Sequence, residues 1–205
     1  MPARQNWFEG WRLFALLSLA LVALSIWIAG MRQFEVDGVR MVIRFTARTS
    51  LLFFCLAFSA AALARLWPNG WTKWLRRNRR YLGVTFAASH GIHAIAIACF
   101  AVMDPVGYAA ATSIASYIFG GVGYAFIIAM TATSFDRTAA ALGARAWRWL
   151  HISGGYYLLF QFMVSFGKRI PDMPLYALFL IPLVAVFALR MIAMAPRAQA
   201  PAQAG

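Results

Sequence analysis

Residues 13–28 read LFALLSLALVALSIWI, a run without a charged residue whose only hydroxyl side chains are Ser18 and Ser25. A helix needs roughly 20 apolar residues to cross the hydrocarbon core of a bilayer. With its flanks this run is long enough to do so. It is too long for the hydrophobic region of a cleaved signal peptide, and no clear small-residue cleavage site follows it. We therefore expect a signal anchor that stays in the membrane as the first transmembrane helix.

The composition places the rest of the chain in the same class. Of the 205 residues 62% are hydrophobic and 12% are charged, against about 45–50% and 25% in soluble domains. The apolar residues fall into six stretches, which cover residues 12–30, 45–66, 81–103, 110–134, 146–166 and 174–194. We therefore predict an all-α polytopic membrane bundle of about six transmembrane helices over residues 12–194. It lies between a short cytoplasmic segment (1–11) and a disordered cytoplasmic tail (195–205).

The basic residues predict the orientation of the chain. Lys and Arg number 19 against 6 Asp and Glu, a net charge of +13. Thirteen of the 19 fall at the chain ends and in the loops after the second and fourth stretches: Arg4, Arg12, Arg65, Lys73, Arg76, Arg77, Arg79, Arg80, Arg137, Arg145, Arg148, Arg190 and Arg197. By the positive-inside rule both termini are then cytoplasmic. We expect a multi-pass protein of the bacterial inner membrane, in contact with anionic lipid. Nucleic acid is not an expected partner, because no basic module lies outside the stretches.

The remaining basic residues include a regular series. Arg40, Arg44 and Arg48 recur every four residues and so share one helix face near the outer end of the second span. Dinucleotide-binding and phosphate-loop motifs are missing, and no segment is long enough for a nucleotide-binding domain. We therefore expect no flavin or nucleotide site in this chain. Cys55 and Cys99 fall inside apolar stretches and are interpreted as small buried side chains.

The three histidines, His90, His93 and His151, all lie inside predicted spans. Ionisable side chains are costly in a membrane and commonly mark a function. His90 and His93 are three residues apart and so share one helix face. With the uncertainty of the span boundaries, His90 and His151 could reach similar depths on two parallel helices. Such a pair could clamp a haem by axial ligation. The alternative is that each histidine makes an interhelical hydrogen bond. Three histidines confined to two spans favour the cofactor.

Two sequence patterns resemble the ferric-reductase-like transmembrane domain family, which includes haem-binding membrane subunits of the MsrQ (YedZ) type. The first is RRYLG (79–83) followed by SHGIH (89–93), similar to the third helix of that family. The second is TSFDR (133–137), LG (142–143) and WRWLH (147–151), similar to the start of its fifth helix. The patterns occur in the family's order and spacing, and the resemblance covers roughly residues 45–190.

The resemblance implies haem b held by histidines of the third and fifth helices. By position, His93 and His151 match ligands of the family. The family's second histidine on each helix falls here on Arg79 and Val164, neither of which is a normal haem ligand. The resemblance therefore implies one haem rather than two, although two stay open, as does a haem-free member. The missing ligand would come from His90, paired with His151, or less readily from Gln161.

The dense group Arg76, Arg77, Arg79 and Arg80 has two interpretations. It sets topology and contacts lipid, or it pairs with haem propionates and docks an acidic flavoprotein. Taken with the resemblance, the expected function is an electron-transfer subunit. Electrons would enter from a cytoplasmic flavin reductase or from quinol and leave to a periplasmic acceptor protein. The rival is a haem-free membrane scaffold or small-solute transporter, in which the histidines pack or relay protons.

Overall fold

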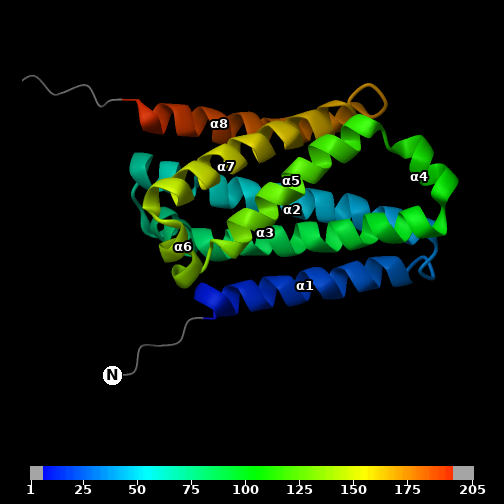
Figure 1. The fold of residues 1–205 in the computed structure, drawn as a ribbon, viewed down its shortest axis with the longest axis horizontal. Coiled ribbons are helices and arrows are strands. Elements are labelled where there is room, and N and C mark those ends of the chain that lie inside the picture. Colours follow the sequence, from blue (N-terminus) through cyan, green and yellow to red (C-terminus); the bar gives the residue numbers. More distant parts are fainter. Residues whose placement is uncertain (1–6, 196–205) are drawn as a thin grey trace, which may run out of the picture.

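The computed structural model describes residues 7–195 as an all-α bundle without a strand in that range (Figure 1). The elements in chain order are α1 (Gly10–Gly30), α2 (Val36–Leu66), α3 (Gly70–Met103), α4 (Pro105–Ala111), α5 (Ile114–Ala132), α6 (Asp136–Leu142), α7 (Ala144–Gly167), the 3-10 helix η1 (Pro174–Phe179) and α8 (Leu180–Met194). The predicted fold class is confirmed. Most of the two predicted terminal segments, namely residues 1–6 and 196–205, lies outside the described residues.

Five segments have the length and apolar composition of membrane spans. They are α1, α2, α3, α5 and the continuous segment Pro174–Met194. The chain is therefore a multi-pass membrane protein. The predicted fifth span, 146–166, is helix α7, which also runs the length of the bundle (Figure 1). It is not among the five. Its sequence contains Arg145, Arg148, His151 and Gln161, whereas the other long helices have less polar central stretches.

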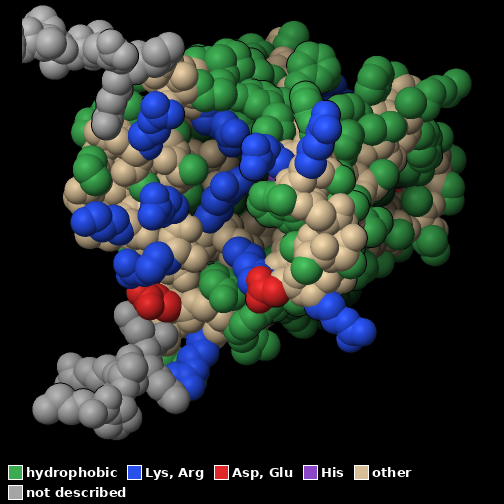
Figure 2. All heavy atoms as spheres, turned by 60° about the vertical axis from the view of Figure 1, so that its left-hand side comes forward, with side chains coloured by type: hydrophobic (Ala, Val, Ile, Leu, Met, Phe, Trp, Pro, Cys, Tyr) green, Lys and Arg blue, Asp and Glu red, His purple; other side chains and the backbone are tan. Residues whose placement is uncertain are grey.

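The bundle has two distinct ends. Both ends of the described chain, the turn between α2 and α3, and α6 lie at one end (Figure 1). Arginine and lysine side chains crowd this end in the space-filling view (Figure 2), and we call it the basic end. The opposite end carries the connection between α1 and α2 and the short helix α4 (Figure 1). The positive-inside rule predicts that the basic end faces the cytoplasm.

Helices α2 and α3 extend beyond the apolar stretches that predicted them. Helix α2 begins at Val36 rather than at 45. Helix α3 begins at Gly70 rather than at 81, because Asn69 caps it. The Asn69 side chain accepts a hydrogen bond from Thr72 N (2.9 Å), and Thr72 Oγ1 accepts one from Asn69 N (3.0 Å). Such reciprocal caps satisfy two backbone donors of the first turn. The arginines 76–80 thus lie on a helix and not in a loop.

The most extensive helix contact joins α2 and α3. A row of hydroxyl side chains lies along it, which we call the polar seam: Thr46, Thr49, Ser50 and Ser89. Ser89 Oγ lies 2.8 Å from Thr49 Oγ1, accepts a hydrogen bond from Ser50 Oγ at 3.0 Å and donates to Thr46 O at 3.2 Å. Interhelical hydrogen bonds of this kind hold membrane helices together where the lipid offers no hydrophobic driving force.

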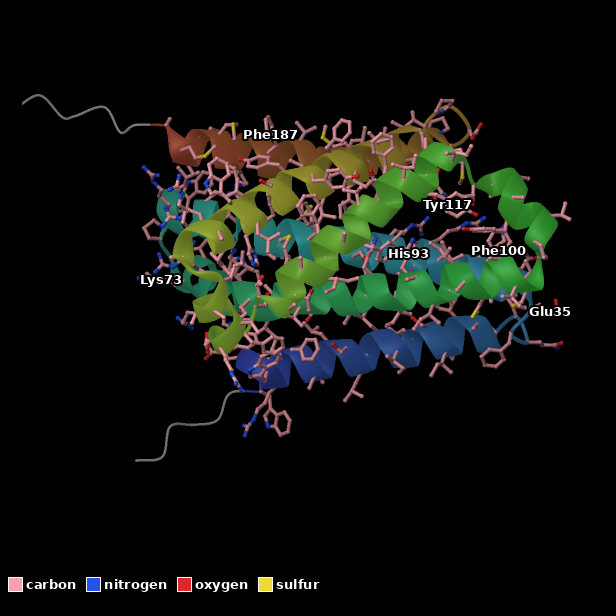
Figure 3. All side chains as sticks on the ribbon, in the orientation of Figure 1. Glu35, Lys73, His93, Phe100, Tyr117 and Phe187 are labelled. Carbon is pink, nitrogen blue, oxygen red and sulfur yellow. The ribbon has the colours of Figure 1, made fainter. Side chains whose placement is uncertain are left out.

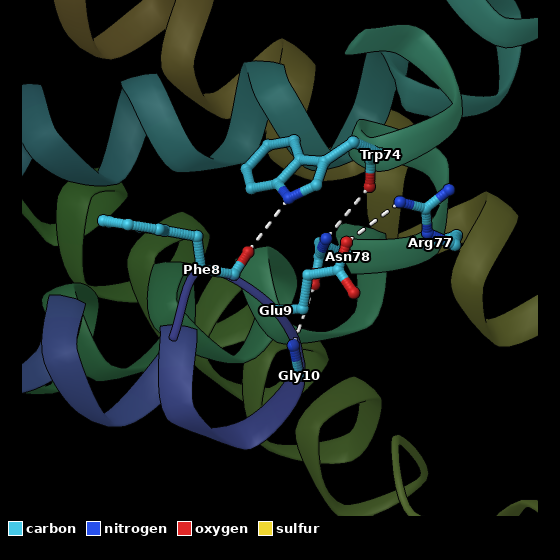
Figure 4. Close-up of polar contacts among 6 residues, drawn as sticks. All are labelled: Phe8, Glu9, Gly10, Trp74, Arg77 and Asn78. Carbon is cyan, nitrogen blue, oxygen red and sulfur yellow. Dashed lines mark hydrogen bonds and ion pairs between the residues drawn. The ribbon is translucent and has the colours of Figure 1, made fainter. Parts of the chain in front are cut away.

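Helix α1 is fixed to α3 at the basic end (Figure 4). Buried Asn78 accepts a hydrogen bond from Gly10 N at 2.9 Å and donates to Trp74 O at 3.1 Å. The Trp74 indole donates to Phe8 O at 2.9 Å, and Arg77 pairs with Glu9 at 2.9 Å. Gly10 has a φ of +68°, a conformation that glycine adopts without strain. We call this set of contacts the α1 latch.

Small residues bring helices close at two points. A Cβ built on Gly38 would lie 2.9 Å from Ala29 O, so α2 passes close to the end of α1 there. A Cβ on Gly154 would lie 2.5 Å from Met130 Sδ, so α7 passes close to α5. Cys55 is buried as predicted, but Cys99 is exposed. The prediction for Cys99 was wrong because an apolar stretch of a membrane helix also has a face toward lipid.

Candidate functional site

His90 and His93 lie together on α3, as their spacing predicts. Their ring centroids are 5.1 Å apart and the rings are nearly parallel, at 27°. His93 lies in the half of the bundle toward Glu35 and Phe100, away from Lys73 at the basic end (Figure 3). The two histidines therefore form one pair deep in the bundle.

Contacts with α2 orient His93. Its Nδ1 lies 3.1 Å from Ile43 O and 3.0 Å from Thr46 Oγ1. Thr46 donates its own proton to Val42 O at 2.7 Å, so its oxygen accepts at the histidine. We therefore assign the proton of neutral His93 to Nδ1, which leaves a lone pair on Nε2. Fixing one ring nitrogen in this way is how proteins prepare the other as a ligand.

His90 lies in an aromatic environment. The centroids of Tyr124, Phe86 and Phe162 lie 5.1, 5.5 and 6.1 Å from the centroid of its ring. Its Nδ1 is buried and has no hydrogen-bond partner among residues 7–195. An unpaired buried polar atom costs about 1–3 kcal/mol. Two arrangements are consistent with this. His90 carries its proton on Nε2 and leaves Nδ1 as an unpaired acceptor, or Nδ1 binds a group that is not part of the protein.

His151 lies on α7 near the basic end. Its ring stacks on Trp147 with centroids 4.2 Å apart. Its Nε2 lies 3.2 Å from Thr133 Oγ1, which donates to Ala129 O at 2.8 Å. The sequence patterns assigned no role at the site to Trp147. Its spacing of four residues from His151 was the available signal for the stack, because residues four apart share a helix face.

The structure separates His151 from His90, contrary to the expectation of similar depths. His90 contacts Tyr124, whereas His151 contacts Thr133 at the end of the same helix, α5. From 124 to 133 the helix rises about 13 Å. The third span was predicted to begin at residue 81, whereas α3 projects back to Gly70, so His90 lies farther from the basic end than that boundary implied. The structure therefore places His90 and His151 at different levels of the bundle.

A cavity of about 350 Å³ opens at the basic end. Its polar lining is His151, Thr131, Thr133, Ser134, Asp136 and five arginines, Arg76, Arg77, Arg79, Arg80 and Arg190. Its apolar lining includes Phe54, Phe58, Phe86, Ile127, Met130 and Leu158. Neither His90 nor His93 lines it. The cavity combines apolar walls with a strongly cationic lining, and Figure 2 shows the lysine and arginine side chains that gather at this end of the molecule.

The arginines of this cavity are not neutralised equally. Arg77 pairs with Glu9 and Arg80 with Asp136, each at 2.9 Å, and these are the ion pairs that residues 7–195 contain. Arg79 has no carboxylate partner within the described range. The Arg80 Nε is buried and unpartnered there. The cavity therefore retains capacity to bind an anionic group.

Arg190 was not singled out by the sequence beyond its contribution to topology. Its guanidinium carbon lies 4.2 Å from the Phe58 ring centroid and 5.3 Å from that of Tyr156. Its Nη1 donates to Phe58 O at 3.3 Å. These contacts hold the Arg190 guanidinium of α8 against α2. Phe58 and Arg190 are too far apart in the chain for any local sequence pattern to predict their contact.

The side chains at this cavity fit one haem better than two. His151 supplies an imidazole, the apolar walls suit a macrocycle, and the arginines suit propionates. Gly83 lines the cavity, and a Cβ built there would meet nothing within 4 Å. Arg79 lines the same cavity as His151, so a second histidine is missing at this level. Val164 is 45% exposed, and its side chain has no atom that can bind iron.

No family model, no curated protein and no solved structure matches the chain. The fold and the site together define an all-helical multi-pass membrane protein with an arginine-rich cavity at one end. The family resemblance stays a prediction from the sequence patterns.

Proposed function

We propose that the chain is a membrane haem b protein that passes electrons across the bilayer, as a ferric-reductase-like electron-transfer subunit of the bacterial inner membrane. One observation carries the proposal. His151 lies on the wall of a cavity that is apolar inside and rimmed by five arginines. This combination suits a planar, apolar ligand with anionic substituents.

Different residues of the cavity would bind the iron and the propionates of the haem. His151 would bind the iron, with its ring held by the stack on Trp147. Arg79 and the unpartnered Nε of Arg80 would hold the propionates. The aromatic walls would exclude water and lower the local dielectric. A bound haem would supply one-electron redox chemistry, which the protein tunes through ligation and burial.

The electron donor would be a separate molecule. The described residues form membrane helices and short connecting helices, so oxidation of a reduced nicotinamide would take place on a partner protein. The positive surface of the basic end suits an acidic cytoplasmic flavin reductase, because complementary charge steers encounter. Quinol from the bilayer is the alternative donor, and a periplasmic protein would accept the electrons.

The test is the absorption spectrum of the detergent-purified protein, oxidised and then reduced with dithionite, with a pyridine haemochrome assay. We expect about one haem b per chain in the wild type, as one cavity with one histidine suggests. His151→Ala should lose the haem. His93→Ala is the matched control and should keep it, because His93 does not line the cavity. Full haem occupancy in His151→Ala would refute ligation by this residue.

A second function has its own supporting observation. The ring nitrogens His93 Nδ1 and His151 Nε2 both lie within 3.2 Å of threonine hydroxyls. If His151 bound iron through Nε2, it would have to give up its hydrogen bond to Thr133. These contacts favour a haem-free scaffold or small-solute transporter, in which the histidines join helices. A colourless protein purified from cells with adequate haem supply would support that function.

A further inference from the structure

A second group of cations lies at the opposite end of the bundle and is not used by the proposed function. Arg40, Arg44 and Arg48 lie on α2 and are exposed. Gly38 of α2 packs against Ala29, near the end of α1. Counted from Gly38, Arg44 and Arg48 lie about 9 and 15 Å back toward the basic end at 1.5 Å per residue. Both therefore lie nearer the basic end than the contact of Gly38 with the end of α1.

The neighbours of these arginines are aromatic and cationic. The Arg48 guanidinium carbon lies 5.4 Å from the Phe179 ring centroid, and that of Arg169 lies 5.6 Å from the Tyr176 ring centroid. The rings of Tyr176 and Phe179 are themselves 5.6 Å apart. Two guanidinium groups thus lie over one aromatic pair, beside the Tyr176 hydroxyl. We call Arg44, Arg48 and Arg169 the outer arginine group.

No carboxylate neutralises the outer arginine group within residues 7–195. Both ion pairs of that range lie at the basic end. Arg44 has neither a hydrogen bond nor a ring contact there. Arg40, by contrast, lies 5.4 Å from the Phe100 ring centroid, nearer the end of α2. Cations on a membrane-spanning helix are costly unless they are paired, reach the interface or face water.

A bound oxyanion would neutralise the unpaired positive charge of the outer arginine group. Arg44 and Arg48 are four residues apart, so their side chains leave the same helix face about 5–6 Å from each other at Cβ. Guanidinium groups bind phosphate with paired, charge-assisted hydrogen bonds. The Tyr176 hydroxyl offers a further donor beside Arg48 and Arg169.

We propose that the outer arginine group, with Tyr176, binds a phosphate oxyanion at the end of the bundle opposite the basic end, either on an anionic phospholipid headgroup or as free phosphate. The site is separate from the cavity of His151, and it does not depend on haem binding.

The test compares the wild type with Arg44→Gln/Arg48→Gln in a neutral detergent. Inorganic phosphate is titrated while the thermal unfolding midpoint is recorded. Native mass spectrometry then counts lipids retained from nanodiscs of phosphatidylglycerol or of phosphatidylcholine. Arg32→Gln is the control, because it removes an exposed arginine from the connection between α1 and α2.

We expect the double variant to bind the anion at least about tenfold more weakly, since it loses hydrogen bonds to a charged group. Arg32→Gln should behave like the wild type. If phosphate raises the unfolding midpoint and phosphatidylglycerol is not selectively retained, the ligand of the site is free phosphate. Selective retention of phosphatidylglycerol would identify the headgroup. Equal phosphate response and equal lipid retention in the wild type and the double variant would overturn the proposal.

Arg44→Gln alone guards against misfolding of the double variant. Among residues 7–195 Arg44 makes no hydrogen bond, ion pair or ring contact that this substitution would break, so the single variant should fold and still bind phosphate more weakly. Unchanged affinity in a folded Arg44→Gln would remove Arg44 from the site. Haem content is recorded in parallel and should not change in either variant.

Discussion

At the scale of single residues, His93 is held by the polar seam. Its Nδ1 meets both Thr46 and the Ile43 carbonyl, and Thr46 is fully buried. The sequence predicted the shared face of His90 and His93 from their spacing of three. It did not predict Thr46 as a partner, because that contact depends on the register between α2 and α3. The register is set by the packing of two long helices and not by any local pattern.

Thr46→Val should destabilise the bundle by about 0.6–2 kcal/mol, the usual contribution of an interhelical hydrogen bond in a membrane. The volume is conserved, so the loss reports the hydroxyl. Unfolding in mixed micelles with increasing dodecyl sulfate would measure it. Thr112→Val, at the end of α4 and outside the seam, is the control. A Thr46→Val protein as stable as the wild type would show that this bond adds nothing net.

Gly154 permits the close approach of α7 and α5. Gly154→Ala should cost about 1–3 kcal/mol, because the new methyl group would overpack against Met130 and Phe126. Gly120→Ala on α5 meets nothing within 4 Å. It should be neutral or slightly stabilising, because alanine favours helix. The thermal unfolding midpoints of the two variants, measured side by side, test the difference. Equal midpoints would contradict the packing at Gly154.

At the scale of helices, apolar stretches predicted where the chain crosses the bundle but not how far each helix extends. Helix α3 begins at Gly70 because Asn69 and Thr72 cap each other. That pair of polar residues was readable in the sequence, but it lies in a segment that hydropathy assigns to a loop. The extension has a direct effect on the site, since it places Arg76–Arg80 on the cavity and puts His90 and His151 at different levels.

The α1 latch makes its own prediction. Asn78→Ala removes the partner of Gly10 N and one link of the contacts between α1 and α3. Leaving the half-buried Gly10 N–H unpaired should destabilise the start of α1 by up to about 1–3 kcal/mol. Faster protease cleavage near residue 10 in detergent would reveal it. Arg65→Ala, an exposed arginine at the end of α2, is the control. Unchanged cleavage in Asn78→Ala would show that the remaining contacts of the α1 latch suffice.

At the scale of the whole molecule, charge predicts which end faces the cytoplasm. Arg145 lies at the basic end and Asp172 in the connection between α7 and η1. In a Cys99→Ser background, a membrane-impermeant maleimide should label Asp172→Cys in intact spheroplasts. It should label Arg145→Cys only after lysis. The reverse pattern would invert the orientation, and with it the side from which the cavity of His151 is reached.

The pairing of α2 with α3 also bears on how the protein is made. The two helices are joined by the short turn 67–69, and the polar seam lies between them. Synthesis runs from the amino end, so both helices exist before α5 is translated. Each helix alone would present serine and threonine hydroxyls to acyl chains, whereas the hairpin conceals them. Insertion into the bilayer is therefore expected to proceed with α2 and α3 as one unit, onto which the later helices assemble.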